Sequence, residues 1–343
     1  MSFWKILPKP IMGMAPMDGV TDYAFRQILA QTAKPSVIFT EFVHVMALWH
    51  GKSYVYEGLK FDELQRPIVA QIFGSQPEYF YKAAHIICEL GFDGIDINMG
   101  CPANTIVRRG GGAQLIQTPQ LAQELIMQTR RGINDWVDGQ TLTQLGLNKN
   151  KIQLIKQMKN GKHNQKLPIP ISIKTRLGVE TNTLQQWSDY LLETNPDALT
   201  VHGRTLKQLY HGQANWQAIA SISQKVRAAG IVYLGNGDIK NHTDALEKAK
   251  YFQLDGILIG RAALGNPWVF SQNQTVELKQ RLNTLLEHAR VFCQNTNDKQ
   301  FPALKKHLGW YCQGFDGAKK LRIQLMENKN YFEIEETVLS FGY

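Results

Sequence analysis

A cysteine stands at the end of an apolar run in the stretch DGIDINMGCPANTIVRRGGGAQLIQ, residues 93–117. Cys101 follows Gly100, which permits close approach of a ligand, and precedes Pro102, which ends a strand. An unperturbed thiol has a pKa of about 8.5, so at neutral pH it is mostly protonated and can donate a proton. The pattern indicates a candidate acid at the carboxyl end of a strand, with Asn98 nearby. A buried structural cysteine is the alternative.

A lysine and a histidine end two later apolar runs, Lys174 after PIPISI and His202 after DALTV. A lysine inside a bundle of strands is costly unless it meets an anion or an electron-rich ring. At matching positions of adjacent strands, these two side chains could hold the edge of a flavin ring, where negative charge builds on reduction. A histidine satisfied within the core is the alternative for His202.

Glycine-rich turns follow the last two apolar runs, GNGDI at 235–239 and IGRAALGNP at 259–267. In α/β barrels, the loops after strands seven and eight often bind phosphate through backbone N–H groups. Arg261 adds a permanent positive charge, so we expect a phosphate site here. Glycines that merely permit tight turns are the alternative. No GxGxxG follows a strand and opens a helix, which argues against a Rossmann dinucleotide site.

The stretch HGRTLKQLYHGQANW at 202–216 combines basic with aromatic side chains. This combination suits a single-stranded or flipped nucleobase, because bases stack on aromatic rings and phosphates attract cations. The chain has a formal net charge of +9, and a basic surface attracts polyanions. A charged loop with a structural tryptophan is the alternative.

Short β-rich runs at helix-length intervals must position these residues. Each run is continuous rather than alternating, as in parallel strands that are covered on both faces. Eight strand–helix units predict a (β/α)8 TIM barrel, in which all strand carboxyl ends converge on one mouth. We favour it over a doubly wound open sheet because side chains suited to a site end nearly every run. These residues are Met17, Glu41, Gln71, Asn98, Lys174, His202, Asn236 and Arg261.

After residue 270 the strand signals stop, and 275–292 and 301–326 have amphipathic helical patterns. We therefore divide the chain into a barrel domain, 1–270, and a C-terminal all-helical domain, 271–343. The barrel carries a polar, lysine-rich insertion at about 135–166, before the fifth strand. A solvated hairpin or helix is one interpretation of it, and an added basic contact surface is the other.

The four cysteines are scattered, without a CxxC pair or the spacing of a zinc site. We therefore expect no metal site and no disulfide framework, and we expect the reducing environment of the cytoplasm. Prolines interrupt the apolar residues near the start of the chain, which predicts no signal peptide. No run approaches the roughly 20 apolar residues of a membrane span, so we expect no membrane association.

Taken in order, these stretches resemble the tRNA-dihydrouridine synthase family over nearly the whole chain. GMAPMDGVTDYAFR is similar to the family's first strand and flavin-binding loop, and IDINMGCPANTIVRRGGGAQL is similar to the signature around its catalytic cysteine. IKTRLG, VHGRTLKQLYHGQANW, NGDI and IGRAALGNPW follow in family order. KKHLGWYCQG resembles the helical RNA-binding domain, especially of the bacterial B-type branch. The insertion at 135–166 departs from the family pattern.

The resemblance implies an FMN-bound barrel that reduces a specific uridine of tRNA, in the D-loop, to 5,6-dihydrouridine with NADPH. We expect a monomer that acts without a metal. Cys101 would be the catalytic acid, and Asn98, Arg176 and Tyr210 would face the substrate base. Contacts to the flavin ring and its phosphate would come from Ala15, Pro16, Met17, Gln71, Lys174, His202, Asn236, Gly237, Asp238, Gly260 and Arg261.

In the implied reaction, flavin N5 delivers hydride to uracil C6 and Cys101 delivers a proton to C5 from the opposite face. A flexible loop after Cys101 would let the nucleotide enter. Two alternatives stay open. A dihydroorotate dehydrogenase-like FMN barrel acting on a free pyrimidine would share the flavin site but would not need a basic helical domain. A tRNA-binding chaperone without chemistry would not need Cys101, Lys174, His202 and Arg261 together.

Overall fold

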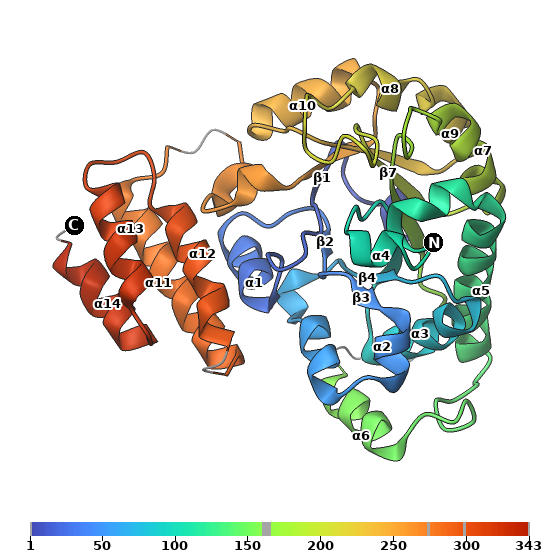
Figure 1. Ribbon diagram of the computed structural model, residues 1–343, viewed down its shortest axis with the longest axis horizontal. Coiled ribbons are helices and arrows are strands. Elements are labelled where there is room, and N and C mark those ends of the chain that lie inside the picture. The colour runs from blue at the N-terminus through green and yellow to red at the C-terminus, as the bar shows by residue number, and fades with distance from the viewer. Residues whose placement is uncertain (1, 160–165, 273–274, 298–299, 342–343) are drawn as a thin grey trace.

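One parallel sheet forms a barrel in the computed structural model, which describes residues 2–159, 166–272, 275–297 and 300–341 (Figure 1). Neighbouring strands follow the order β1-β9-β8-β7-β6-β5-β4-β2, and a parallel bridge between Gly13 and Val37 joins the two ends of this series. The (β/α)8 prediction is confirmed. The strands are β1 (Ile11–Met14), β2 (Ile38–Phe39), β3 (Val43–His44), β4 (Ile68–Phe73), β5 (Gly94–Met99), β6 (Ile171–Arg176), β7 (Ala198–His202), β8 (Val232–Asn236) and β9 (Gly256–Ile259).

The second predicted strand, 36–42, contains only the short strand β2; the short β3 begins just beyond it, and both pair with β4. Between them the Thr40 hydroxyl accepts the hydrogen bond of the Gln71 backbone N–H, at 3.1 Å. A side chain thus replaces a main-chain acceptor, and the strand is interrupted at residues 40–42. The interruption, which includes Glu41, lies at the barrel mouth.

Helices surround the barrel on its outer face (Figure 1). Pro77 and Pro119 begin two of them, where the missing N–H of proline costs nothing, and the left-handed Gly91 ends the first. The helices are α1 (Tyr23–Thr32), α2 (Val45–His50), α3 (Pro77–Leu90), α4 (Asn104–Val107), α5 (Pro119–Val137), α6 (Lys149–Met158), α7 (Leu184–Glu193), α8 (Trp216–Ala220), α9 (Ser223–Ala228) and α10 (His242–Tyr251).

Four further helices pack together beside the barrel, at the left of Figure 1. They are α11 (Leu278–Asn295), α12 (Phe301–Tyr311), α13 (Ala318–Glu327) and α14 (Tyr331–Ser340). Their leucines, among them Leu285, Leu304 and Leu321, form an apolar core separate from that of the barrel. Ala24 and Ile28 of α1 belong to this second core. Helix α1 therefore joins the barrel to the helical part of the chain.

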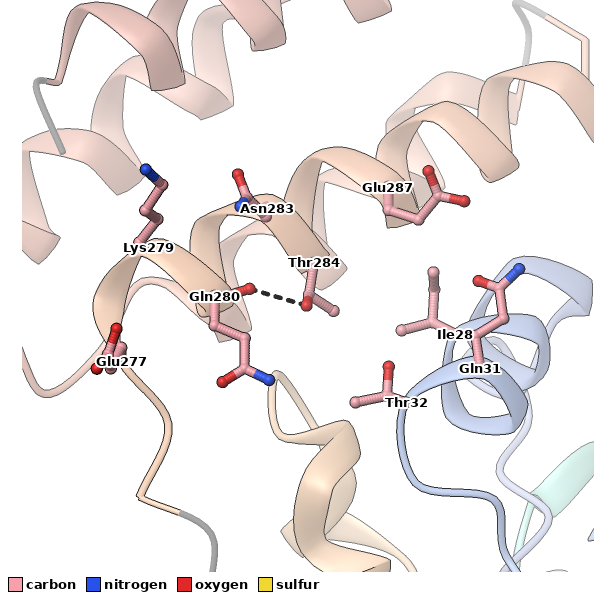
Figure 2. Close-up of a pocket in the computed structure, with 9 residues that line it drawn as sticks. All are labelled: Ile28, Gln31, Thr32, Glu277, Lys279, Gln280, Asn283, Thr284 and Glu287. Atoms are coloured by element: carbon pink, nitrogen blue, oxygen red, sulfur yellow. Dashed lines mark hydrogen bonds between the residues drawn. The ribbon is translucent and has the colours of Figure 1, made fainter.

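The seam between α1 and α11 opens at one side into a pocket of about 460 Å³. Figure 2 shows Gln31 and Thr32 of α1 facing Gln280, Thr284 and Glu287 of α11 across it. None of the residues that the sequence predicts for the site lines this pocket. It is a feature of the junction between barrel and helices.

The insertion forms helix α6 and packs its apolar face on the barrel, with Ile155 fully buried. Two of its lysines contact the barrel itself: the Lys151 ammonium donates to the Trp49 carbonyl, and Lys159 lies 3.3 Å from Glu89. This agrees with a packed, solvated helix; residues 160–165 of the insertion lie outside the described residues. Of the helices described, none is long and apolar enough to span a bilayer.

Candidate active site

The strand register brings the predicted site residues to one mouth. Residues paired on neighbouring strands lie about 5 Å apart, so their side chains are neighbours. Because every strand of the barrel is parallel, the paired residues gather at the same end. The pairs are Gln71 with Asp96, Asn98 with Lys174, Arg176 with His202, and His202 with Asn236.

Cys101 lies just past β5 and is 8% exposed. Its backbone N–H donates to Oδ1 of Asn98 at 2.8 Å, and its carbonyl accepts from the Ala113 N–H at 3.1 Å. Burial raises the pKa of the Cys101 thiol. The thiol is therefore protonated at neutral pH, and the backbone that carries it is held from both sides.

The glycine-rich loop after Cys101 folds back onto the cysteine. It contains α4 and a 3₁₀ turn at 112–117. Gly112 has φ +59°, and a Cβ there would lie 2.7 Å from the Cys101 carbonyl oxygen. Only glycine combines that conformation with so close an approach. Arg108 and Arg109 are on the same loop, seven and eight residues after the cysteine.

A buried polar network supports Cys101 from inside the barrel. Asn98 Nδ2 donates to Gln71 Oε1 at 2.9 Å, and Gln71 Nε2 donates to Asp96 Oδ2 at 2.7 Å. The Ser172 hydroxyl donates to the other Asp96 oxygen at 2.6 Å. Burial raises the pKa of Asp96 to about 6. Asp96 and Ser172 were missed by sequence reasoning because they lie inside apolar runs.

Lys174 is a partly buried cation at the mouth. Its ammonium donates to Oδ1 of Asn236 at 3.2 Å, and Asn236 donates in turn to the Leu258 carbonyl at 2.8 Å. Burial, and then the nearby Arg176, lower the pKa of Lys174 to about 8. The lysine thus keeps most of its charge at neutral pH but lacks a full counter-ion. It is poised to interact with an electron-rich group.

His202 and Asp238 are linked by an arginine that sequence reasoning missed. Arg204 is 2% exposed, lies 3.3 Å from Nε2 of His202 and donates to Oδ2 of Asp238 at 2.7 Å. Burial, and then Lys174, lower the pKa of His202, so its imidazole is neutral. Arg261 donates to the second Asp238 oxygen, at 2.7 Å. Asp238 therefore holds two arginines at the mouth, one buried and one exposed.

Gly237 and Gly260 make close approaches at the same mouth. A Cβ on Gly237, which has φ +131°, would lie 2.7 Å from the Cβ of Ala214. A Cβ on Gly260 would lie 3.5 Å from the Met17 sulfur and 3.6 Å from the Cβ of Ala15. The predicted loop 15–17, which includes Pro16, is thus adjacent to the loop after β9.

Arg176 and Tyr210 differ in their exposure to solvent. Arg176 is 3% exposed and donates to the carbonyls of Gly100 at 2.6 Å and Leu209 at 3.2 Å. Tyr210 is 61% exposed, and the Arg261 guanidinium carbon lies 5.8 Å from its ring centroid. Arg176 ties two loops together, and Tyr210 offers an open aromatic face.

Comparisons with known proteins show the family of the chain. A family model described as dihydrouridine synthase matches residues 13–160 and 147–340. A probable tRNA-dihydrouridine synthase of Staphylococcus aureus (strain COL) is 32% identical over 97% of this chain and 93% of its own. Probable tRNA-dihydrouridine synthase 2 of Bacillus subtilis (strain 168) is also 32% identical, over 99% and 96%.

A solved structure supports the fold alone. Histamine dehydrogenase from Rhizobium sp. 4-9 aligns with a TM-score of 0.51 at 11% identity, over 81% of this chain and 48% of that one. The sequence matches show the family as well as the fold, because the family model covers most of the chain and two relatives align along nearly its full length. The chain belongs to the dihydrouridine synthase family, whose members are oxidoreductases.

Proposed function

We propose that this chain reduces a specific uridine of tRNA to 5,6-dihydrouridine, with FMN in the barrel mouth and NADPH as the reductant. The observation that carries the proposal is the presence of a buried, protonated thiol and a partly buried, charged amine at one mouth, Cys101 and Lys174. The family and the names of the relatives supply the substrate class.

The charge of the residues at the mouth fits the phosphate of FMN. The phosphate would meet backbone N–H groups at the start of the 3₁₀ turn at 261–263 and the Arg261 side chain, which is 59% exposed. Gly237 leaves room where a side chain would intrude, and Gly260 has no side chain beside Ala15 and Met17. Lys174 and the neutral His202 would lie at the ring edge, with Ala15, Pro16 and Met17 on the other side.

When bound, FMN would supply the hydride for C6 of the pyrimidine. Cys101 would donate its proton to C5, and its raised pKa keeps the proton available at neutral pH. Asn98 holds the Cys101 backbone through its hydrogen bond, Gln71 holds Asn98, and Asp96 holds Gln71. We propose that Asn98, Arg176 and Tyr210 also face the substrate base.

Extraction of a uridine from folded tRNA costs a few kcal/mol of unstacking, which phosphate contacts must offset. We propose the barrel, 1–270, as the catalytic domain and 271–343 as the tRNA-binding domain. Helix α13 carries Lys319, Lys320 and Arg322 on one short, exposed segment. Arg108 and Arg109 add charge on the loop that follows Cys101. A D-loop target, a monomeric state and a cytoplasmic location complete the proposal.

The test is to purify the full chain, record its visible absorption spectrum, and incubate it with NADPH and unmodified tRNA transcripts. We expect a yellow protein and dihydrouridine at one D-loop position, mapped by primer extension after alkaline treatment. NADPH oxidation with unmodified tRNA, together with activity on a free pyrimidine, would select the dihydroorotate dehydrogenase-like alternative. A colourless protein that FMN cannot reconstitute would refute the flavin site.

A further inference from the structure

Three side chains with metal-ligating atoms meet where the barrel joins the helical part of the chain. Asp22 is the N-cap of α1, His288 lies in α11, and His307 lies in α12. One ligand atom from each lies within 4.8 Å of the other two. Across the described ranges, no other three His, Cys, Asp or Glu side chains form such a group.

Both histidines have buried ring nitrogens that lack a partner. His288 and His307 are each 1% exposed. Among the described residues, Nε2 of His288 and Nδ1 of His307 have no hydrogen-bond partner, and the only partner of His307 Nε2 is Oδ2 of Asp22, 3.4 Å away. Buried polar atoms are almost always satisfied, so two unpartnered nitrogens beside a third with one distant partner indicate a missing ligand.

The remaining atoms of the cluster are already oriented by their neighbours. Oδ1 of Asp22 accepts the N–H of Phe25 at 2.8 Å, which leaves Oδ2 for another partner. Nδ1 of His288 lies 3.2 Å from the Tyr311 hydroxyl, which leaves Nε2 directed elsewhere. Metal-ligating histidines and carboxylates are typically held in this way by a second layer of hydrogen bonds.

We propose that Asp22, His288 and His307 bind one zinc ion, which fastens the helical domain to the barrel. Two imidazoles and one carboxylate are ligands that zinc accepts at about 2.0–2.2 Å, with water in the fourth position. Asp22 is 24% exposed, so water can reach the cluster. The separations of up to 4.8 Å require the side chains to draw together around the ion.

The scattered cysteines of the sequence predict no metal site. The proposed ligands lie far apart in the sequence and come together only in the folded chain. Asp22 follows the loop in which the Met17 N–H donates to Thr21, at 3.1 Å. An ion at Asp22 would therefore hold the mouth loop and the helical domain in a fixed relation.

The test is zinc content, a measurement that does not depend on tRNA reduction. The full FMN-loaded chain is equilibrated with Zn²⁺ alone, dialysed, and analysed by atomic emission. We expect about one zinc per wild-type chain and little or none in a His288→Gln/His307→Gln double variant. Asp22→Asn keeps the N-cap acceptor for Phe25 but loses the charged ligand, so we expect zinc binding to weaken about 10-fold or more.

His85→Gln is the matched control, since His85 is also fully buried with both ring nitrogens unpartnered but lies outside the cluster. It should keep its zinc. Zinc content that survives in Asp22→Asn and in the double-histidine variant would overturn the proposal and assign the metal to cysteine thiols. A wild-type chain without zinc would also overturn it. If the double variant does not fold, Asp22→Asn alone decides between these outcomes.

Discussion

Replacing Asn98 with alanine should disturb the chemistry through Cys101. The Asn98 side chain accepts from the N–H groups of Gly100 at 3.0 Å and Cys101 at 2.8 Å, and it donates to Gln71 at 2.9 Å. The substitution leaves the N–H groups of Gly100 and Cys101 without an acceptor, and the side-chain carbonyl of Gln71 without its donor. Together these losses should lower the free energy of unfolding by about 3–5 kcal/mol. With an unfolding entropy of about 2.1 cal/mol/K per residue, the melting temperature should fall by about 4–7 °C.

The decisive assay is a double-mutant cycle. Single-turnover rates of uridine reduction are measured for pre-reduced, FMN-loaded wild type, Asn98→Ala, Cys101→Ala and the double variant. Displacement of a catalytic acid slows a reaction about 10²-fold, so we expect the rate of uridine reduction by Asn98→Ala to fall by about that factor. If Asn98 acts only by positioning Cys101, the double variant should be no slower than Cys101→Ala.

Asn241→Ala serves as the control for the loss of a side-chain acceptor. Asn241 caps α10 and accepts from the Asp244 N–H at 2.8 Å, away from Cys101. It should lose about 1 kcal/mol of stability and keep its reduction rate. If the rate losses of the two single variants multiply in the double variant, the positioning role is refuted. Asn98 would then contact the substrate independently of Cys101.

Three further predictions concern the acid, the lysine and the helical domain. Cys101→Ala should bind FMN and be bleached by NADPH while uridine reduction slows about 10²–10⁴-fold; wild-type turnover would exclude Cys101 as the acid. FMN affinity should fall as pH rises through about 8, because Lys174 is charged only below its lowered pKa. Fluorescence titration checks this, and a pH step that persists in Lys174→Met would contradict it. Glutamine at Lys319, Lys320 and Arg322 should reduce the salt slope of tRNA binding by about one unit for each phosphate that is no longer neutralised. An unchanged salt slope would show that tRNA binds to another surface of the chain.

Much of the barrel could be predicted because its strands are continuous apolar runs. The runs at 66–74 and 92–100 correspond to β4 (68–73) and β5 (94–99). The run at 36–42 did not reveal the break between β2 and β3, because the break depends on the Thr40 hydroxyl contacting Gln71 of a neighbouring strand. A contact between remote residues leaves no periodic pattern in the sequence.

Within the site, the sequence indicated residue types at strand ends but not what each side chain contacts. Gln71 is fully buried and bonded to Asn98 and Asp96, and neither contact could be predicted from the sequence. Asp96 lies in the middle of an apolar run and Arg204 lies in a charged loop, so the sequence did not single out either residue. The pKa shifts of Lys174 and His202 arise from burial and from neighbouring cations, which only the folded chain defines.

The sequence by itself determined the barrel, the helical tail, the family and the position of Cys101, because apolar runs, glycine turns and motif order are local properties of a chain. The tertiary structure decided which polar groups meet. Asp96 reaches Gln71 on the neighbouring strand, Arg204 joins Asp238, and Asp22 meets two histidines from the far end of the chain. Such contacts depend on strand register and helix packing, which bring together residues that no spacing in the sequence relates.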